Sequence, residues 1–135
     1  MRESSSSTIN QIDKNSKYFK RKFKFLNLFN KDNVFKPIEI ELDTLSNYIL
    51  INKIKSIDFL KIDTEGYEYE VLLGLKDNFD FVKIIMFEHH YDNMIKKNYS
   101  YTDINNLLVR KNFKMIYKAK MPFRKTFEYI FIKKN

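Results

Sequence analysis

Residues 57–66, which read IDFLKIDTEG, combine a strand signal with the signal for a turn and a helix start. Residues 57–62 are mostly apolar, which is typical of a strand buried inside a sheet. Residues 63–66 follow at once and predict a turn that leads into a helix. The apolar stripe of that helix is supplied by Val71, Leu72 and Leu75. A buried strand that runs into an amphipathic helix is the building unit of an α/β fold.

Strand and helix signals also alternate on both sides of this unit. Residues 38–42 alternate apolar and polar side chains, which predicts a strand, and Asp43 or Thr44 then caps a helix. The apolar face of that helix carries Leu45, Tyr48, Ile49 and Ile54. Residues 82–88 predict a second buried strand. Thr102 then caps a helix whose apolar face carries Ile104, Leu107 and Leu108.

Two more predicted strands close the chain, at residues 113–119 and 127–133. A turn at Pro122 joins them, so they are antiparallel to each other. The predicted order is strand, helix, strand, helix, strand, helix, strand, strand. This alternation predicts an α/β layered fold with a mostly parallel sheet, to which the closing hairpin adds one antiparallel strand.

The positive charge is concentrated near the N-terminus. Of the net charge of +8, residues 1–36 hold +6 and residues 37–135 hold +2. We expect residues 1–36 to form a basic, Ser-rich, loosely ordered arm with one short strand near residues 22–28, and residues 37–135 to form the folded domain. Lysine supplies 21 of the 25 basic residues, whereas a phosphate-binding protein more often uses arginine, whose planar fork matches phosphate oxygens. The charge therefore does not favour nucleic acid as the partner.

The composition excludes several classes of protein. The chain has no cysteine, which excludes disulfide scaffolds, thiolate catalysis and cysteine-based zinc sites. No stretch approaches the roughly 18 consecutive apolar residues of a membrane span. Residues 1–7 lack the apolar core of a secretory signal. We therefore expect a single cytoplasmic domain with a packed core.

Polar side chains follow both buried strands at the point where each strand ends. Asp63 and Glu65 come just after the first strand, and Glu88, His89 and His90 come at the end of the second. The carboxyl ends of neighbouring parallel strands share one rim of the sheet, where open α/β folds bind their ligands. A carboxylate and an imidazole at this rim can accept a proton from a hydroxyl group or orient it for attack.

Each of these signals has a purely structural alternative. An Asp-x-Glu-Gly sequence after a strand is also an ordinary helix start, and residue type alone favours that alternative. Adjacent histidines in a strand point to opposite faces, so His89 and His90 also fit the start of a surface loop. Asp63, Glu88 and His89 are chemically suited to a metal ion, but no helical histidine spacing supports such a site, and we expect no metal.

A family resemblance rests on the same residues. Residues 57–68, followed by the Val71-Leu72-x-Gly74 pattern and preceded by Thr44-Leu45, resemble the C-terminal half of FkbM-type methyltransferases. In that family a similar stretch forms strand four and the following helix of a class I methyltransferase fold. Residues 84–88 and the later helix and strands fall in the order that the family leads us to expect. The resemblance implies a partial, Rossmann-like, three-layer α/β fold.

The same resemblance implies a reaction. FkbM-type enzymes transfer a methyl group from S-adenosylmethionine, usually to a hydroxyl oxygen of a sugar or another small molecule. On this analogy Asp63, Glu65 and Gly66 bind the cofactor, and Glu88, His89 and His90 bind the acceptor. His89 or Asp63 is the candidate catalytic base. The reaction is an in-line displacement, so the position of the acceptor oxygen matters most.

The chain departs from the family in its glycines. Class I methyltransferases hold the cofactor on a glycine-rich loop after strand one, whereas this chain has only Gly66 and Gly74 and no Gly-x-Gly pattern. We therefore expect a truncated domain in which residues 57–62 lie at an unpaired sheet edge. Three interpretations stay open: an inactive fragment, half of an enzyme completed by another polypeptide or a second copy, and a non-catalytic binding module.

Overall fold

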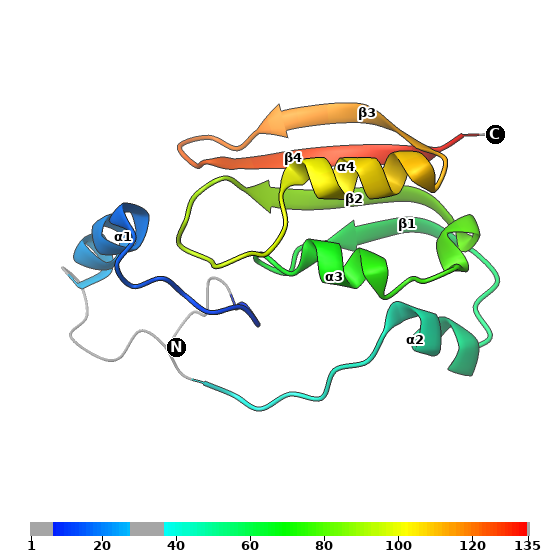
Figure 1. Ribbon diagram of the computed structural model, residues 1–135, viewed down its shortest axis with the longest axis horizontal. Coiled ribbons are helices and arrows are strands. Elements are labelled where there is room, and N and C mark those ends of the chain that lie inside the picture. Colours follow the sequence, from blue (N-terminus) through cyan, green and yellow to red (C-terminus); the bar gives the residue numbers. More distant parts are fainter. Residues whose placement is uncertain (1–6, 28–36, 135) are drawn as a thin grey trace.

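The computed structural model describes residues 7–27 and 37–134 (Figure 1). Two helices precede the first strand, helices and strands then alternate, and a hairpin of two strands comes last. The elements are α1 (Lys17–Asn27), α2 (Leu45–Ile51), β1 (Ile57–Ile62), α3 (Glu68–Leu73), the 3-10 helix η1 (Asn78–Phe81), β2 (Val82–His90), α4 (Tyr101–Arg110), β3 (Phe113–Lys120) and β4 (Thr126–Lys133). The strand and helix predicted from residues 57–75 are both present.

The four strands form one sheet in the order β1-β2-β4-β3. Only β1 and β2 pair in parallel, while β4 pairs antiparallel with β2 on one side and with β3 on the other. The prediction of a mostly parallel sheet is therefore wrong. The reason is where the closing hairpin inserts: β4 lies between β2 and β3, so it makes two of the three strand pairs antiparallel although β1, β2 and β3 all run in one direction.

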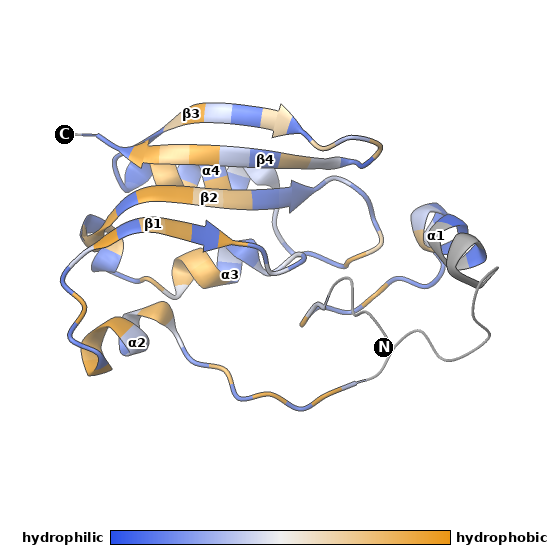
Figure 2. Cartoon of the chain, turned by 180° about the vertical axis from the view of Figure 1, so that it is seen from behind, coloured by the Kyte–Doolittle hydropathy of each residue, from blue (hydrophilic) through white to orange (hydrophobic). Residues whose placement is uncertain are grey.

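Helices cover one face of this sheet. In Figure 1 α3 and α4 lie in front of the strands, and in Figure 2, seen from behind, the strands stand in front of the helices. The core between helices and sheet consists of Ile49, Ile62, Leu72, Leu75, Phe79, Val82, Ile85, Phe87, Tyr99, Ile104, Leu107, Leu108, Phe113, Tyr129 and Phe131. No helix among the described residues covers the opposite face, so this part of the chain forms two layers rather than the expected three.

We call this uncovered side the outer sheet face. Side-chain alternation and the strand register place Phe59, Lys61, Ile84, Met86, Glu88, Tyr117, Glu128, Ile130 and Ile132 on it. Phe59 is 51% exposed, so the prediction that β1 is a buried strand is wrong on this face. The sheet order also places β1 at the edge of the described sheet, as the sequence predicted.

Local capping signals account for the helix starts. The Thr44 hydroxyl accepts a hydrogen bond from the Asn47 amide at 3.1 Å and caps α2, as predicted. The cap of α4 is Ser100 rather than the predicted Thr102, because Ser100 and Asp103 form a reciprocal capping box.

Two predicted strands near the N-terminus are absent. Residues 38–42 are extended and exposed but pair with no described strand, because alternation produces a strand only where a neighbour offers a hydrogen-bonding edge. The predicted strand at residues 22–28 is helical through Asn27, and residue 28 lies outside the described residues. The division of the chain at residue 36 stays a prediction.

Candidate functional site

The candidate site lies where β1 and β2 end. Ile62, the last residue of β1, is the register partner of Phe87. Asp63 and Glu65, which follow β1, therefore lie beside the last residues of β2. The sequence placed three polar residues at the end of the second strand, and the structure shows that β2 continues through them. Glu88, His89 and His90 pair there with Glu128, Phe127 and Thr126 of β4.

The two histidines point to opposite faces of the sheet, as strand alternation predicted. The ring of His89 lies on the helix side, 4.8 Å from the ring of Tyr91 and 5.9 Å from that of Tyr99, measured between centroids. Its Nδ1 is buried and has no hydrogen-bond partner among the described residues. Burial, reinforced by the positive charges of Lys97 and His90, lowers the pKa of His89 to about 4. His89 is therefore neutral near pH 7.

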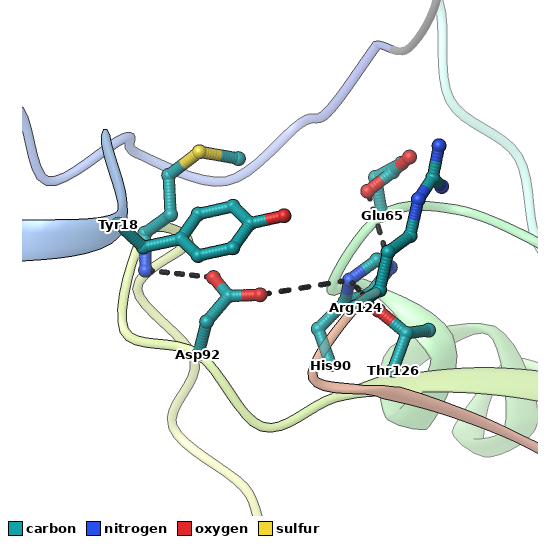
Figure 3. A pocket seen from close by; sticks show the side chains of 7 residues that line it. Tyr18, Glu65, His90, Asp92, Arg124 and Thr126 are labelled. Carbon is teal, nitrogen blue, oxygen red and sulfur yellow. Dashed lines mark hydrogen bonds and ion pairs between the residues drawn. The ribbon is translucent and has the colours of Figure 1, made fainter. Parts of the chain in front are cut away.

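His90 is held by polar groups from three segments of the chain (Figure 3). Its Nδ1 lies 3.0 Å from the Thr126 hydroxyl, in hydrogen-bond contact, and 3.9 Å from Oδ2 of Asp92. Its Nε2 lies 3.2 Å from Oε2 of Glu65, an ion-pair contact whose angle falls outside that of a hydrogen bond. The imidazole thus stands between two carboxylates.

The backbone of Glu65 is unusual. Glu65 has a φ of 50° and Gly66 a φ of 99°, so two consecutive residues adopt the left-handed region that a side-chain-bearing residue rarely occupies. This turn directs the Glu65 carboxylate back toward β2, where it meets His90. Backbone strain of this kind is found most often where a functional side chain has to be held in place.

A pocket opens beside these groups. The pocket is lined by Glu65, His90 and Asp92, by Met94 from the loop after β2, and by side chains from the two ends of the chain, namely Tyr18, Arg124 and Thr126. Tyr18 comes from α1, and Arg124 from the turn between β3 and β4. The pocket therefore offers an acid–base group, a guanidinium and a phenol within one small concave surface.

Asp63 and Glu88 lie away from this row. The Asp63 carboxylate is exposed and pairs with Lys61 at 3.2 Å. Burial and the nearby Asp63 charge raise the pKa of Glu88, which belongs to the outer sheet face. The structure thus separates the predicted residues into three groups: Glu65 with His90, Asp63 with Glu88, and His89 alone among tyrosines. Asp63, Glu88 and His89 do not converge on one point, and no group of three or more His, Asp or Glu residues within the described chain is arranged to hold a metal ion.

A family model described as the methyltransferase FkbM domain matches residues 3–115, which is most of the chain. This chain belongs to the FkbM methyltransferase family. Among curated proteins and solved structures, none matches it. In the FkbM domain described here, no helix is long and apolar enough to cross a membrane.

The residues of this FkbM domain do not by themselves fit S-adenosylmethionine. A Cβ on Gly66 would lie 2.6 Å from Cγ2 of Ile95, and the Gly66 carbonyl accepts a hydrogen bond from the Asn10 side chain. Gly74 is the C-cap residue of α3, and a Cβ on it would lie 3.2 Å from the carbonyl oxygen of Val71. Both glycines are thus enclosed by this chain's own residues, and neither offers an open cradle for a nucleotide.

Sequence reasoning missed five of the residues that line the pocket, namely Tyr18, Asp92, Met94, Arg124 and Thr126. Asp92 lies only two residues beyond the end of β2, but no strand pattern extends to it, so only its closeness to His90 in the sequence could have suggested it. Thr126 and Arg124 could not be found, since only the pairing of β2 with β4 brings them to His90. Tyr18 could not be found either, because it depends on how α1 docks onto the domain.

Proposed function

We propose that this FkbM domain takes part in the O-methylation of a sugar or another small molecule that carries a hydroxyl group. The observation that carries the proposal is the contact between Glu65 and His90 at the wall of the pocket, 3.2 Å apart. Membership of the family supports the reaction class. The contact supplies what O-methylation needs from the protein, which is a group that accepts the hydroxyl proton.

The Glu65–His90 pair acts as the proton acceptor in this proposal. Glu65 is the more exposed partner, with 20% of its side chain accessible against 9% for His90, so the acceptor hydroxyl meets the carboxylate first. The Thr126 hydroxyl orients the imidazole through Nδ1, and Oδ2 of Asp92 lies 3.9 Å from the same nitrogen. This assignment replaces the earlier candidate bases, Asp63 and His89, in our proposal.

The methyl donor implied by the family is S-adenosylmethionine, and we propose that a further polypeptide or a second copy of the chain supplies its cradle. Two features support this. The β1 strand is unpaired on its outer side within the described residues, and strands paired in parallel are ordinarily covered on both faces. The second feature is that the outer sheet face is not covered in this way and exposes Phe59 and Tyr117. We expect the assembled enzyme to act in the cytoplasm.

A second candidate function is a non-catalytic half-domain that binds a partner through the same edge. The enclosed glycines favour it, because a chain without a cofactor cradle has no donor to use. The two functions differ in one measurable property, which is whether an added methyl donor is consumed.

Calorimetric titration of S-adenosylmethionine into the purified chain is the first test, followed by an assay of labelled methyl transfer to a panel of sugars. At chain concentrations at which two copies associate and complete the cradle, we expect transfer that is lost in Glu65→Gln and His90→Asn and retained in His89→Phe, the matched control next to His90. If transfer is equal in all of these variants, the Glu65–His90 assignment is wrong. Absence of both heat and transfer at these concentrations would exclude a cradle supplied by a second copy of the chain.

A further inference from the structure

One end of the molecule carries exposed cations from three separate segments. They come from the N-terminal segment and α1, from the loop after β2, and from the end of β3 with the turn that follows it: Lys14, Lys17, Lys20, Arg21, Lys24, Lys96, Lys120, Arg124 and Lys125. We call this surface the basic end. None of these cations forms an ion pair with another described residue. Arg21 also lies over the Tyr18 ring, 5.7 Å from its centroid, so within the described residues no carboxylate neutralises these cations.

Contacts between the segments hold the basic end together. Ile12 forms an isolated bridge with Ile95, which ties the N-terminal segment to the loop after β2. Tyr18 of α1 and Arg124 of the turn line the same pocket, so α1 and the turn are neighbours. In Figure 1 α1 and the turn after β3 lie at the same end of the molecule, opposite α2.

An apolar side chain projects from this charged surface. Phe123, at the turn between β3 and β4, is completely exposed, more than any other large hydrophobic residue that the structure describes. Its φ of 60° is in the left-handed region, which is rare for a bulky residue. The turn is held by hydrogen bonds from the Met121 amide to the Thr126 carbonyl at 2.9 Å and from the Tyr91 amide to the Lys125 carbonyl at 2.7 Å. The phenyl ring is thus presented to solvent by an ordered turn.

We propose that the basic end binds the surface of an anionic lipid bilayer and that Phe123 inserts between the lipid headgroups. Exposed lysines around a projecting aromatic ring match such a surface in both charge and polarity. Each lysine near an anionic bilayer strengthens binding about fivefold. Burial of a phenyl ring in the acyl-chain region strengthens it about tenfold or more. This inference is independent of the methyl transfer proposed above.

The arrangement favours a bilayer over a nucleic acid. A single-stranded nucleic acid is bound in a groove where cations follow the backbone and aromatic rings stack on the bases. Here the cations lie on a helix, a loop and a turn, and all except Arg21 and Arg124 are lysines. Lysine is a point charge that suits a fluid, laterally mobile array of headgroups better than a bidentate contact with one phosphate.

The test is co-sedimentation of the full chain with phosphatidylcholine vesicles prepared with and without phosphatidylserine. We expect binding only to the vesicles with phosphatidylserine, and weaker binding as salt is added, because salt screens the cations. Phe123→Ser should weaken binding about tenfold. Lys20→Glu combined with Lys24→Glu should weaken it more than tenfold, because each change reverses a charge.

Matched controls lie away from the basic end. Phe59→Ser removes an exposed ring from β1. Lys55→Glu with Lys76→Glu reverses two exposed charges, one just before β1 and one just after α3. We expect these variants to bind vesicles like the unaltered chain. Thermal unfolding of every variant establishes that each is folded.

Three results would overturn the proposal. The first is equal binding to vesicles with and without phosphatidylserine. The second is binding that salt weakens but Phe123→Ser does not, which means adsorption without insertion. The third is tighter binding to a single-stranded oligonucleotide than to the anionic vesicles, with the same dependence on Phe123, which assigns the surface to nucleic acid.

Discussion

Glu88 and Glu128 lie directly opposite each other on the paired strands β2 and β4. The carboxylate of Asp63 adds a third negative charge nearby, and Lys61 offsets part of it. Burial is the main reason why the pKa of Glu88 is raised, and the charges of Asp63 and Glu128 raise it further. Like charges in directly opposed positions destabilise a sheet, so this part of the outer sheet face is electrostatically unfavourable in the isolated chain.

Glu128→Gln should therefore stabilise the chain at neutral pH, by up to about 1 kcal/mol in the free energy of unfolding. Because a carboxyl with a raised pKa weakens the fold as it ionises, the gain should be largest at neutral pH and vanish in acid, where Glu88 is protonated. Urea unfolding at the two pH values measures both effects. A stability that Glu128→Gln leaves unchanged at neutral pH would show that water or Lys61 already screens the pair.

His89 should make the fold sensitive to acid. Its pKa is about 4 in the folded chain against 6.5 for an ordinary histidine. The unfolded chain therefore binds a proton before the folded chain does, and stability falls as the pH is lowered from 6.5 to about 4. The full loss attributable to His89 is about 3 kcal/mol. In His89→Phe this part of the pH dependence should disappear, as measured by urea unfolding across that range. An identical slope in the two proteins would contradict the buried, neutral state of His89.

Gly66 should tolerate no side chain. In Gly66→Ala the new Cβ would meet Ile95 at 2.6 Å, in a backbone conformation with φ of 99°. We expect a loss of about 1–3 kcal/mol in the free energy of unfolding. Gly74→Ala is the matched control, because Gly74 has helical backbone angles and its nearest contact is 3.2 Å. That variant should stay within about 1 kcal/mol of the unaltered chain. Equal effects at both positions would argue against the packing of Ile95 on Gly66.

Leu72 and Leu73 offer a direct test of which side of α3 faces the core. Leu72 is completely buried, whereas its neighbour Leu73 is 48% exposed. Leu72→Ala should cost about 2–5 kcal/mol, because it leaves a cavity beneath the sheet. Leu73→Ala should cost less than about 1 kcal/mol. Chemical denaturation of the two variants measures the difference, and a reversed order would mean that α3 is rotated about its axis.

Much of the architecture was readable from local signals. The strand at residues 57–62, the cap at Thr44 and the apolar stripes of α3 and α4 each depend on side chains close together in the sequence. The family was readable as well, because its most specific residues, 61–66, are contiguous. Opposite directions for His89 and His90 followed from strand alternation alone.

Other features depended on pairing between distant segments. Residues 38–42 and residues 57–62 were both predicted to be strands, yet only the second segment pairs with a neighbour among the described residues. The exposed face of β1 could not be foreseen, since an apolar run looks the same whether one face of the sheet is covered or two.

The candidate site shows the same division. The sequence by itself determined which acid–base side chains stand at the ends of β1 and β2, because strand ends are set by local patterns. Only the tertiary structure decided that Glu65 meets His90 while Asp63 and His89 lie elsewhere. Those contacts depend on a left-handed turn at Glu65 and on Thr126, 36 residues away from His90. The docking of Tyr18 and Arg124 around the pocket was decided in the same way, because packing between segments far apart in the sequence leaves no local pattern.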